Sequence, residues 1–188
     1  PFALKDIYEL KGQITTCGSY EMRQRISTET GTVVRRLLEA GGIAIGKTKT
    51  VECALGGWGT NEHMGTPWNP WDLKYPRVPG GSSSGSGVAV ASGMASCATG
   101  SDTGGSVRLP AAYCGLTGLK VSKACLPTDG IMPLSQTLDT PGPMTRNMPD
   151  LALMFSVMKG IDGRKIEIDM MNGDGLFNIQ MNIFKGLK

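Results

Sequence analysis

Two serines in glycine-rich stretches are the residues of this sequence best suited to covalent chemistry. Ser82 follows Gly80-Gly81, and Ser106 ends the run from Thr103 through Gly104 and Gly105. Consecutive backbone N–H groups in such a run can form a nest for a negative oxygen. A serine at its end can attack a carbonyl carbon while those N–H groups hold the oxyanion. The pattern therefore suits acyl transfer.

A serine nucleophile needs a base, and the sequence holds a single histidine, His63. Lysine can act as a base when burial lowers its pKa, because desolvation disfavours the charged ammonium. Lys5 directly follows the apolar residues Phe2-Ala3-Leu4, which predict a buried strand. From the residues alone, Lys5 is either this base or a solvated surface lysine.

Three shorter motifs point to other chemistry, and their surroundings argue against each. Gly41–Thr48 (GGIAIGKT) has the letters of a P-loop, but a helix precedes it and its middle residues predict a strand. Gly81–Gly85 (GSSSG) has the letters of a nucleophile elbow, yet no histidine follows it. Ser156–Lys159 (SVMK) matches S-x-x-K, but it lies in a predicted amphipathic helix without the partner motifs S-D-N and K-T-G.

Composition indicates an ordinary globular protein of 188 residues, with 40% hydrophobic and 19% charged residues. The formal charge of +3 is spread along the chain and gives no nucleic-acid footprint. No apolar run reaches the roughly 18 residues of a membrane span, and no basic-then-apolar signal peptide opens the sequence. The chain opens at Pro1 rather than Met, so we expect a piece of a longer protein.

The cysteines predict neither a disulfide framework nor a metal site. There are five, an odd number, and no C-x-x-C pair occurs among them: Cys17, Cys53, Cys97, Cys114 and Cys125. A single histidine excludes a multi-histidine centre within this chain. We therefore expect no metal, no cofactor, and free thiols in a reducing cytoplasm.

The predicted elements alternate between strand and helix, as in α/β folds. They are a strand at Pro1–Leu4, a helix at Thr30–Ala40, a strand at Ile43–Ile45, a small-residue helix at Val88–Ala98 with a serine as its N-cap, a strand over Cys114–Val121 and a helix at Met148–Gly160. The two serine loops, Gly80–Gly85 and Asp102–Ser106, flank the small-residue helix. Because small residues pack closely, we expect both loops to lie near one point.

The stretch Pro79–Ser122, with its ordered G-G-S-S and G-S-D-T-G-G-S-V-R motifs, resembles the amidase signature family of serine amidases. The resemblance covers residues 1–162, and residues 163–188 match weakly as a tail of the same domain. It implies an α/β fold with a mixed central β-sheet covered by helices on both faces. Family members are much longer, so only the N-terminal part of that fold is expected here.

The resemblance also implies a Ser–Ser–Lys triad. Ser106 matches the nucleophile that forms the acyl-enzyme. Ser82 matches the bridging serine, which the family holds after a cis peptide bond, and Lys5 matches the catalytic lysine that accepts the proton in its neutral form. The backbone N–H groups of Thr103, Gly104, Gly105 and Ser106 match the oxyanion hole.

Substrate contacts are implied less directly. The family lines its acyl pocket at the positions of Ala54, Leu55 and Gly56. Trp58 follows in the same loop, which favours an aromatic or apolar acyl group. Asp102 and Arg108 flank the nucleophile loop, and we expect them to fix it rather than to exchange protons.

Three functions agree with this sequence. The first is an amidase that hydrolyses a small linear amide. The second is the glutaminase subunit of a tRNA-dependent amidotransferase, which would use the same triad within a multi-subunit complex. The third is a non-catalytic fragment or scaffold. We expect a small-molecule amide substrate, no direct contact with nucleic acid or membrane, and a homodimer or, for the second function, amidotransferase subunits as partners.

Overall fold

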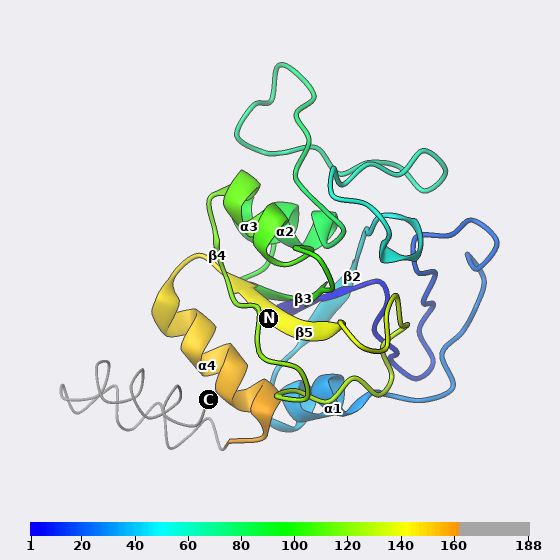
Figure 1. The fold of residues 1–188 in the computed structure, drawn as a ribbon, viewed down its shortest axis with the longest axis vertical. Helices are drawn as coiled ribbons and strands as arrows, with labels where there is room; N and C mark the ends of the chain where they lie inside the picture. Colours follow the sequence, from blue (N-terminus) through cyan, green and yellow to red (C-terminus); the bar gives the residue numbers. More distant parts are fainter. Residues whose placement is uncertain (162–188) are drawn as a thin grey trace.

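The computed structural model describes residues 1–161, which form a five-stranded mixed sheet in the order β2-β1-β3-β5-β4 (Figure 1). The strands are β1 (Phe2–Lys5), β2 (Ala44–Thr48), β3 (Cys97–Asp102), β4 (Thr117–Gly118) and β5 (Thr140–Thr145). β1 pairs in parallel with β2 and β3, whereas β5 runs antiparallel to β3 and β4. The predicted tail, residues 163–188, lies outside the described residues.

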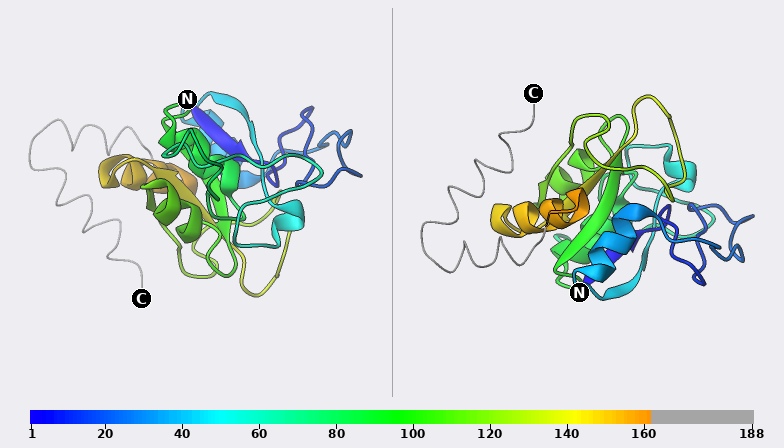
Figure 2. Two further views of the ribbon diagram at one scale, coloured as in Figure 1. Left: turned by 90° about the horizontal axis from the view of Figure 1, so that it is seen from above. Right: turned by 90° about the horizontal axis from the view of Figure 1, so that it is seen from below.

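Helices cover both faces of this sheet. They are α1 (Thr32–Glu39), α2 (Ser84–Ala91), α3 (Arg108–Cys114) and α4 (Met148–Lys159), with a short 3-10 helix at Glu52–Ala54. α2 and α3 pack together on one face, and α1 and α4 pack together on the other (Figures 1 and 2). The predicted fold class, a mixed sheet between two helical layers, is confirmed. None of the helices in residues 1–161 has both the length and the apolar character to cross a bilayer.

β1 supplies both layers of the core and then the candidate base. Side chains alternate between the two faces of a strand. Phe2 and Leu4 join the apolar cluster beneath α1 and α4. Ala3 joins the cluster on the α2 face, together with Val90. Lys5 lies two residues after Ala3, so its side chain points to the same face of the sheet, the α2 face, where the serine loops lie.

The two helices on the α1/α4 face agree with the sequence prediction. In α1 the buried residues Val33, Val34 and Leu37 follow helical spacing. α4 begins where the Asn147 side chain accepts a hydrogen bond from the Asp150 backbone N–H, and it ends at Gly160, which has a left-handed φ.

The prediction of a helix over Val88–Ala98 is wrong in its limits. α2 begins earlier, at Ser84, and the chain re-enters the sheet as β3 from Cys97. The second half of the Gly/Ser run is helical and packs closely because its residues are small: a Cβ on Gly85 would lie 2.5 Å from the backbone nitrogen of Lys49. Ser83 occupies the N-cap, but its side chain makes no capping hydrogen bond.

The strand predicted over Cys114–Val121 is also wrong for most of its length. Arg108–Cys114 forms α3, which ends at the left-handed Gly115, and only Thr117–Gly118 pairs as a strand. The sequence does not predict β5, because the segment TPGPMT contains two prolines and a glycine, which are depleted in strands. Its six residues are nevertheless all buried, with β3 on one side and β4 on the other.

Candidate active site

Lys5 is fully buried at the end of β1, so the alternative of a solvated surface lysine is wrong. Its Nζ lies 2.7 Å from Ser82 Oγ and 2.8 Å from Ser101 Oγ. The Lys5 backbone N–H donates to Thr99 Oγ1 at 3.1 Å, which joins the end of β1 to β3. The structure therefore brings together two of the three predicted triad residues, although 77 positions separate them in sequence.

Burial changes the protonation of Lys5. Desolvation lowers the pKa of its amine from 10.5 to about 7, against the opposing effect of the negative charges on Asp102 and Asp139. About half of the molecules then carry a neutral amine at a pH near 7. A neutral amine can accept a proton, whereas an ammonium cannot.

Ser82 is held beside Lys5 by the backbone around it. The Gly81–Ser82 peptide bond is cis, as the resemblance implies. The Ser82 carbonyl accepts a hydrogen bond from Thr50 Oγ1 at 2.9 Å. A Cβ on Gly81 would lie 2.7 Å from the nitrogen of Gly59 and 2.8 Å from the oxygen of Gly56, so only glycine fits there. The Ser82 side chain is fully buried.

Ser106 lies at the end of the nucleophile loop, directly before Val107 and α3. Its carbonyl accepts a hydrogen bond from the backbone N–H of Ser83 at 3.3 Å, so the two serine loops meet as predicted. α2 and β3 together, rather than a single helix, connect these loops. Ser106 Oγ makes no hydrogen bond within residues 1–161, so the expected contact between Ser106 and Ser82 is not formed in this structure. Catalytic hydrogen bonds often tighten only when substrate binds.

The loop from Thr103 to Ser106 has four backbone N–H groups, and none of them donates to an acceptor in the described part of the chain. Gly104 is exposed, and Gly105 has a φ of +140° that favours glycine. The four N–H groups are therefore available to an anionic oxygen, as the proposed oxyanion hole requires.

Asp102 and Arg108 lie on either side of this loop and hold its two ends together. The buried Asp102 carboxylate accepts Arg108 Nε and Nη2, each at 3.0 Å, and the Val107 backbone N–H at 3.2 Å. Burial alone would raise the pKa of Asp102, but these hydrogen bonds outweigh it and keep the pKa below its ordinary value. The pair is thus a charged structural clamp, the role that the sequence predicts for it.

The predicted acyl-pocket residues do not all line one cavity. A cavity of about 380 Å³ lies beside the candidate base, and its lining includes Ala54, Ser101 and Asp139. Leu55, Gly56 and Trp58 do not line it. Leu55 is 72% exposed and Trp58 is 66% exposed, so neither side chain encloses a ligand within residues 1–161.

Two residues near the site were missed by the sequence analysis. Ser101 accepts a hydrogen bond from Lys5 Nζ, and its signal is its place inside the G-S-D-T-G-G-S motif. Asp139 accepts a hydrogen bond from Thr103 Oγ1 across 36 residues, and no local pattern marks that pairing.

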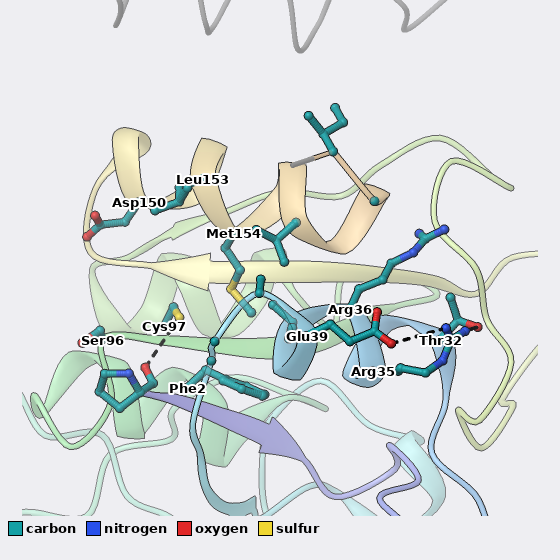
Figure 3. Close-up of a pocket in the computed structure, with 18 of the residues that line it drawn as sticks. Phe2, Thr32, Arg35, Arg36, Glu39, Ser96, Cys97, Asp150, Leu153 and Met154 are labelled. Atoms are coloured by element: carbon teal, nitrogen blue, oxygen red, sulfur yellow. Dashed lines mark hydrogen bonds and ion pairs between the residues drawn. The ribbon is translucent and has the colours of Figure 1, made fainter. Parts of the chain in front are cut away.

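A larger cavity, of about 1210 Å³, opens on the opposite helical layer (Figure 3). Arg35 and Arg36 of α1 and Leu153 and Met154 of α4 contribute to its lining. None of the predicted catalytic, oxyanion or acyl-pocket residues lines this cavity. The chemistry that these residues could perform therefore belongs to the α2/α3 side of the sheet.

Comparison with known proteins agrees with this geometry. The chain is 47% identical over 158 residues to the 2-amino-5-chloromuconic acid deaminase of Comamonas testosteroni, covering 84% of this chain and 34% of the relative. It is 44% identical over 164 residues to a glutamyl-tRNA(Gln) amidotransferase subunit from Chromohalobacter salexigens, covering 87% of this chain and 33% of the relative.

Solved structures show the same likeness. The peptide amidase of Stenotrophomonas maltophilia superposes with a TM-score of 0.78 at 35% identity, over 84% of this chain and 33% of that one. The corresponding glutamyl-tRNA(Gln) amidotransferase subunit from Thermotoga maritima superposes with a TM-score of 0.80 at 39% identity, over 84% of this chain and 34% of that one.

The chain thus spans about one third of the length of these relatives. The family model described as Amidase matches residues 1–179, nearly the whole sequence. On this match, and on the identities above, the chain belongs to the Amidase family.

Proposed function

We propose that this chain carries the catalytic core of a serine amidase that hydrolyses the C–N bond of a linear carboxamide. The observation that carries the proposal is the buried contact of 2.7 Å between Lys5 Nζ and Ser82 Oγ, with the Lys5 pKa lowered to about 7. A neutral amine in contact with a serine hydroxyl is an arrangement for moving protons.

The first half of the reaction makes the acyl-enzyme. Ser106 Oγ attacks the amide carbon, its proton passes to Ser82 Oγ, and Ser82 gives its own proton to the neutral amine of Lys5. The tetrahedral oxyanion is held by the N–H groups of residues 103–106, where loss of one donor typically costs about 3–4 kcal/mol. The C–N bond then breaks as Lys5 returns a proton through Ser82 to the departing nitrogen.

The second half releases the acid. Water attacks the acyl carbon and loses a proton to Lys5 through Ser82. The C–O bond to Ser106 then breaks, and the proton returns to Ser106 Oγ. A carboxylic acid leaves, and Lys5 is neutral again, so each residue ends in its starting state and no cofactor takes part.

For the acyl group, we propose an apolar chain held beside Ala54. The lining of the nearby cavity includes the apolar residues Ile131, Met132 and Pro141. The hypothesis that Trp58 also contacts this group can be tested with Trp58→Ala, assayed on a pair of amides with apolar and polar acyl groups. We expect the preference for the apolar amide to fall. An unchanged preference would remove Trp58 from the acyl pocket.

A glutaminase within an amidotransferase complex is the second candidate, favoured by the 44% identity to an amidotransferase subunit of this family. It would use the same steps, with glutamine as the amide and another protein of the complex receiving the ammonia. Glutamine hydrolysis, compared with hydrolysis of simple carboxamides, separates the two candidates.

A fluorophosphonate probe tests the proposal in the full chain. We expect labelling at Ser106, located by peptide mass spectrometry, and no labelling of Ser106→Ala. Ser82→Ala and Lys5→Met should label far more slowly because the proton relay is broken. Ser92→Ala is a matched control, since Ser92 is exposed at the end of α2. A folded wild type that takes no label would favour the scaffold hypothesis instead.

A further inference from the structure

The carboxylate of Asp139 joins two loops that are distant in sequence. Asp139 directly precedes β5, and its Oδ2 accepts the backbone N–H groups of Leu134 at 2.8 Å and Ser135 at 2.9 Å. Its Oδ1 accepts the hydroxyl of Thr103. One carboxylate thus fastens its own loop and the first residue of the nucleophile loop.

Thr103 is the first residue of the nucleophile loop and directly follows Asp102, which pairs with Thr140 of β5 and accepts hydrogen bonds from Val107 and Arg108. At the far end the loop is held by the Ser106 carbonyl, which accepts from Ser83, and by the Gly105 carbonyl, which accepts from Leu109 at 2.7 Å. The N–H groups of residues 103–106 have no acceptor among residues 1–161 and add nothing to the anchoring. Among residues 103–106, the Thr103 hydroxyl bond to Asp139 is therefore the contact that holds the start of the loop, next to the hydrogen bonds of Asp102.

We propose that Asp139 is a positioning residue, which aims the backbone N–H groups of residues 103–106 at the oxyanion by holding the Thr103 hydroxyl. This rests on the proposed function, since an oxyanion forms at that place only if Ser106 is acylated. Donors for an oxyanion act through their fixed direction, so a loop that loses its anchor stabilises the transition state less well.

Asp139 has a second effect, which acts through its charge. The groups that face the Lys5 amine are Asp102 at the end of β3, Asp139 before β5, and the thiol of Cys17 in the segment after β1. The negative charge of Asp139 raises the pKa of Lys5 and so works against burial. Replacing that charge with a neutral amide should move the rise of activity with pH to a lower pH.

Asp139→Asn in the full chain tests both effects. We expect kcat for amide hydrolysis to fall about 10- to 100-fold with little change in KM, because the lost direction matters only in the transition state. The midpoint of the pH profile should move below that of the wild type. Thr103→Val should give the same fall in kcat without the pH shift, and Thr103→Ser should restore kcat. The double variant should lose no more kcat than either single one.

Asp72→Asn is the matched control. Asp72 also accepts two backbone N–H groups, those of Lys74 and Tyr75, and one side chain, that of Arg77. It contacts neither residues 103–106 nor Lys5. We expect wild-type kcat and an unchanged pH profile.

A measurement that needs no turnover completes the test. Hydrogen exchange by mass spectrometry should show faster exchange of the Ser83 and Leu109 amides, which donate to the Ser106 and Gly105 carbonyls of this loop, in Asp139→Asn than in Asp72→Asn or the wild type. Equal exchange and equal kcat in the two variants would overturn the role of Asp139. If the wild type takes no fluorophosphonate label, the proposed function fails, while the exchange comparison still decides whether Asp139 holds the loop.

Discussion

At the scale of single residues, the proposed role of Lys5 as the base predicts a reaction that depends on pH. Burial lowers its pKa to about 7, so the neutral form that can accept a proton becomes the major one only above that pH. We expect the rate of fluorophosphonate labelling to rise about tenfold per pH unit below a midpoint near 7 and to level off above it. Lys5→Met should lose this pH dependence. The exposed Lys11→Met is the control and should keep the wild-type profile. A wild-type midpoint above 9 would contradict the lowered pKa of Lys5.

The same residue links stability to pH. Between the folded-state pKa of about 7 and the ordinary value of 10.5, the unfolded chain binds a proton at Lys5 that the folded chain does not. The free energy of unfolding should therefore rise with pH across this window. The difference between wild type and Lys5→Met, measured by urea unfolding at several pH values, isolates this effect from other titrating groups. A difference that stays constant from pH 7 to 10 would contradict it.

The residue scale is also where the sequence is most informative. Lys5 and Ser82 are predicted as partners because each lies in a short contiguous segment of sequence that matches the family. Ser101 also lies in a matching segment, but the small residues of that segment predict a loop. The structure instead places Ser101 on β3, where its hydroxyl accepts a hydrogen bond from Lys5 Nζ. The pairing of Asp139 with Thr103 depends on how two distant loops fold, which no local pattern encodes.

At the scale of elements, the position of α2 depends on the small side chains at its start, Ser84 to Gly87. Gly85 packs against Lys49, whose backbone oxygen also accepts the Gly85 N–H at 2.9 Å. Gly85→Ala would place a methyl group 2.5 Å from that backbone. Overpacking of this kind costs about 1–3 kcal/mol, which exceeds the roughly 1 kcal/mol that alanine gains over glycine in a helix. We expect a lower urea midpoint and slower labelling of Ser106, because α2 begins two residues after Ser82.

The control for this prediction is Gly46→Ala in β2, where an added Cβ meets nothing within 4 Å and φ is not left-handed. Its urea midpoint should stay close to that of the wild type. If both variants behave alike, close packing does not set the position of α2.

Elements also show why composition misleads. The Gly/Ser run before Val88 has the composition of a flexible linker, yet its second half, residues 84–87, forms the buried start of α2, because small residues suit both a loop and a tight contact. The composition of β5 also misleads: its prolines and glycine favour turns, yet the segment is a fully buried strand. In both cases the neighbours in space, α3 and β2 for the helix and β3 for the strand, override local propensity.

At the scale of the whole molecule, one apolar cluster connects the ends of the described chain. It contains Phe2 and Leu4 from β1, Val34 from α1 and Phe155 from α4, all buried. Lys5 extends β1 directly from this cluster, so the site on the α2 face rests on a core packed beneath the opposite face. Loss of the core should therefore remove the site at the same time.

Phe155→Ala tests this dependence in the full chain. Phe155 is fully buried, and truncation of such a residue typically costs about 3–5 kcal/mol. We expect a much lower urea midpoint, with Ser106 labelling and the far-UV circular dichroism signal lost together, because β1 belongs to the apolar clusters on both faces of the sheet. Met148→Ala, at a position 42% exposed on the same helix, should leave both transitions near the wild-type midpoint. Labelling lost at a clearly lower urea concentration than helicity would mean that the serine loops unfold independently of the core, and that α2 and the nucleophile loop form a separate unit of stability.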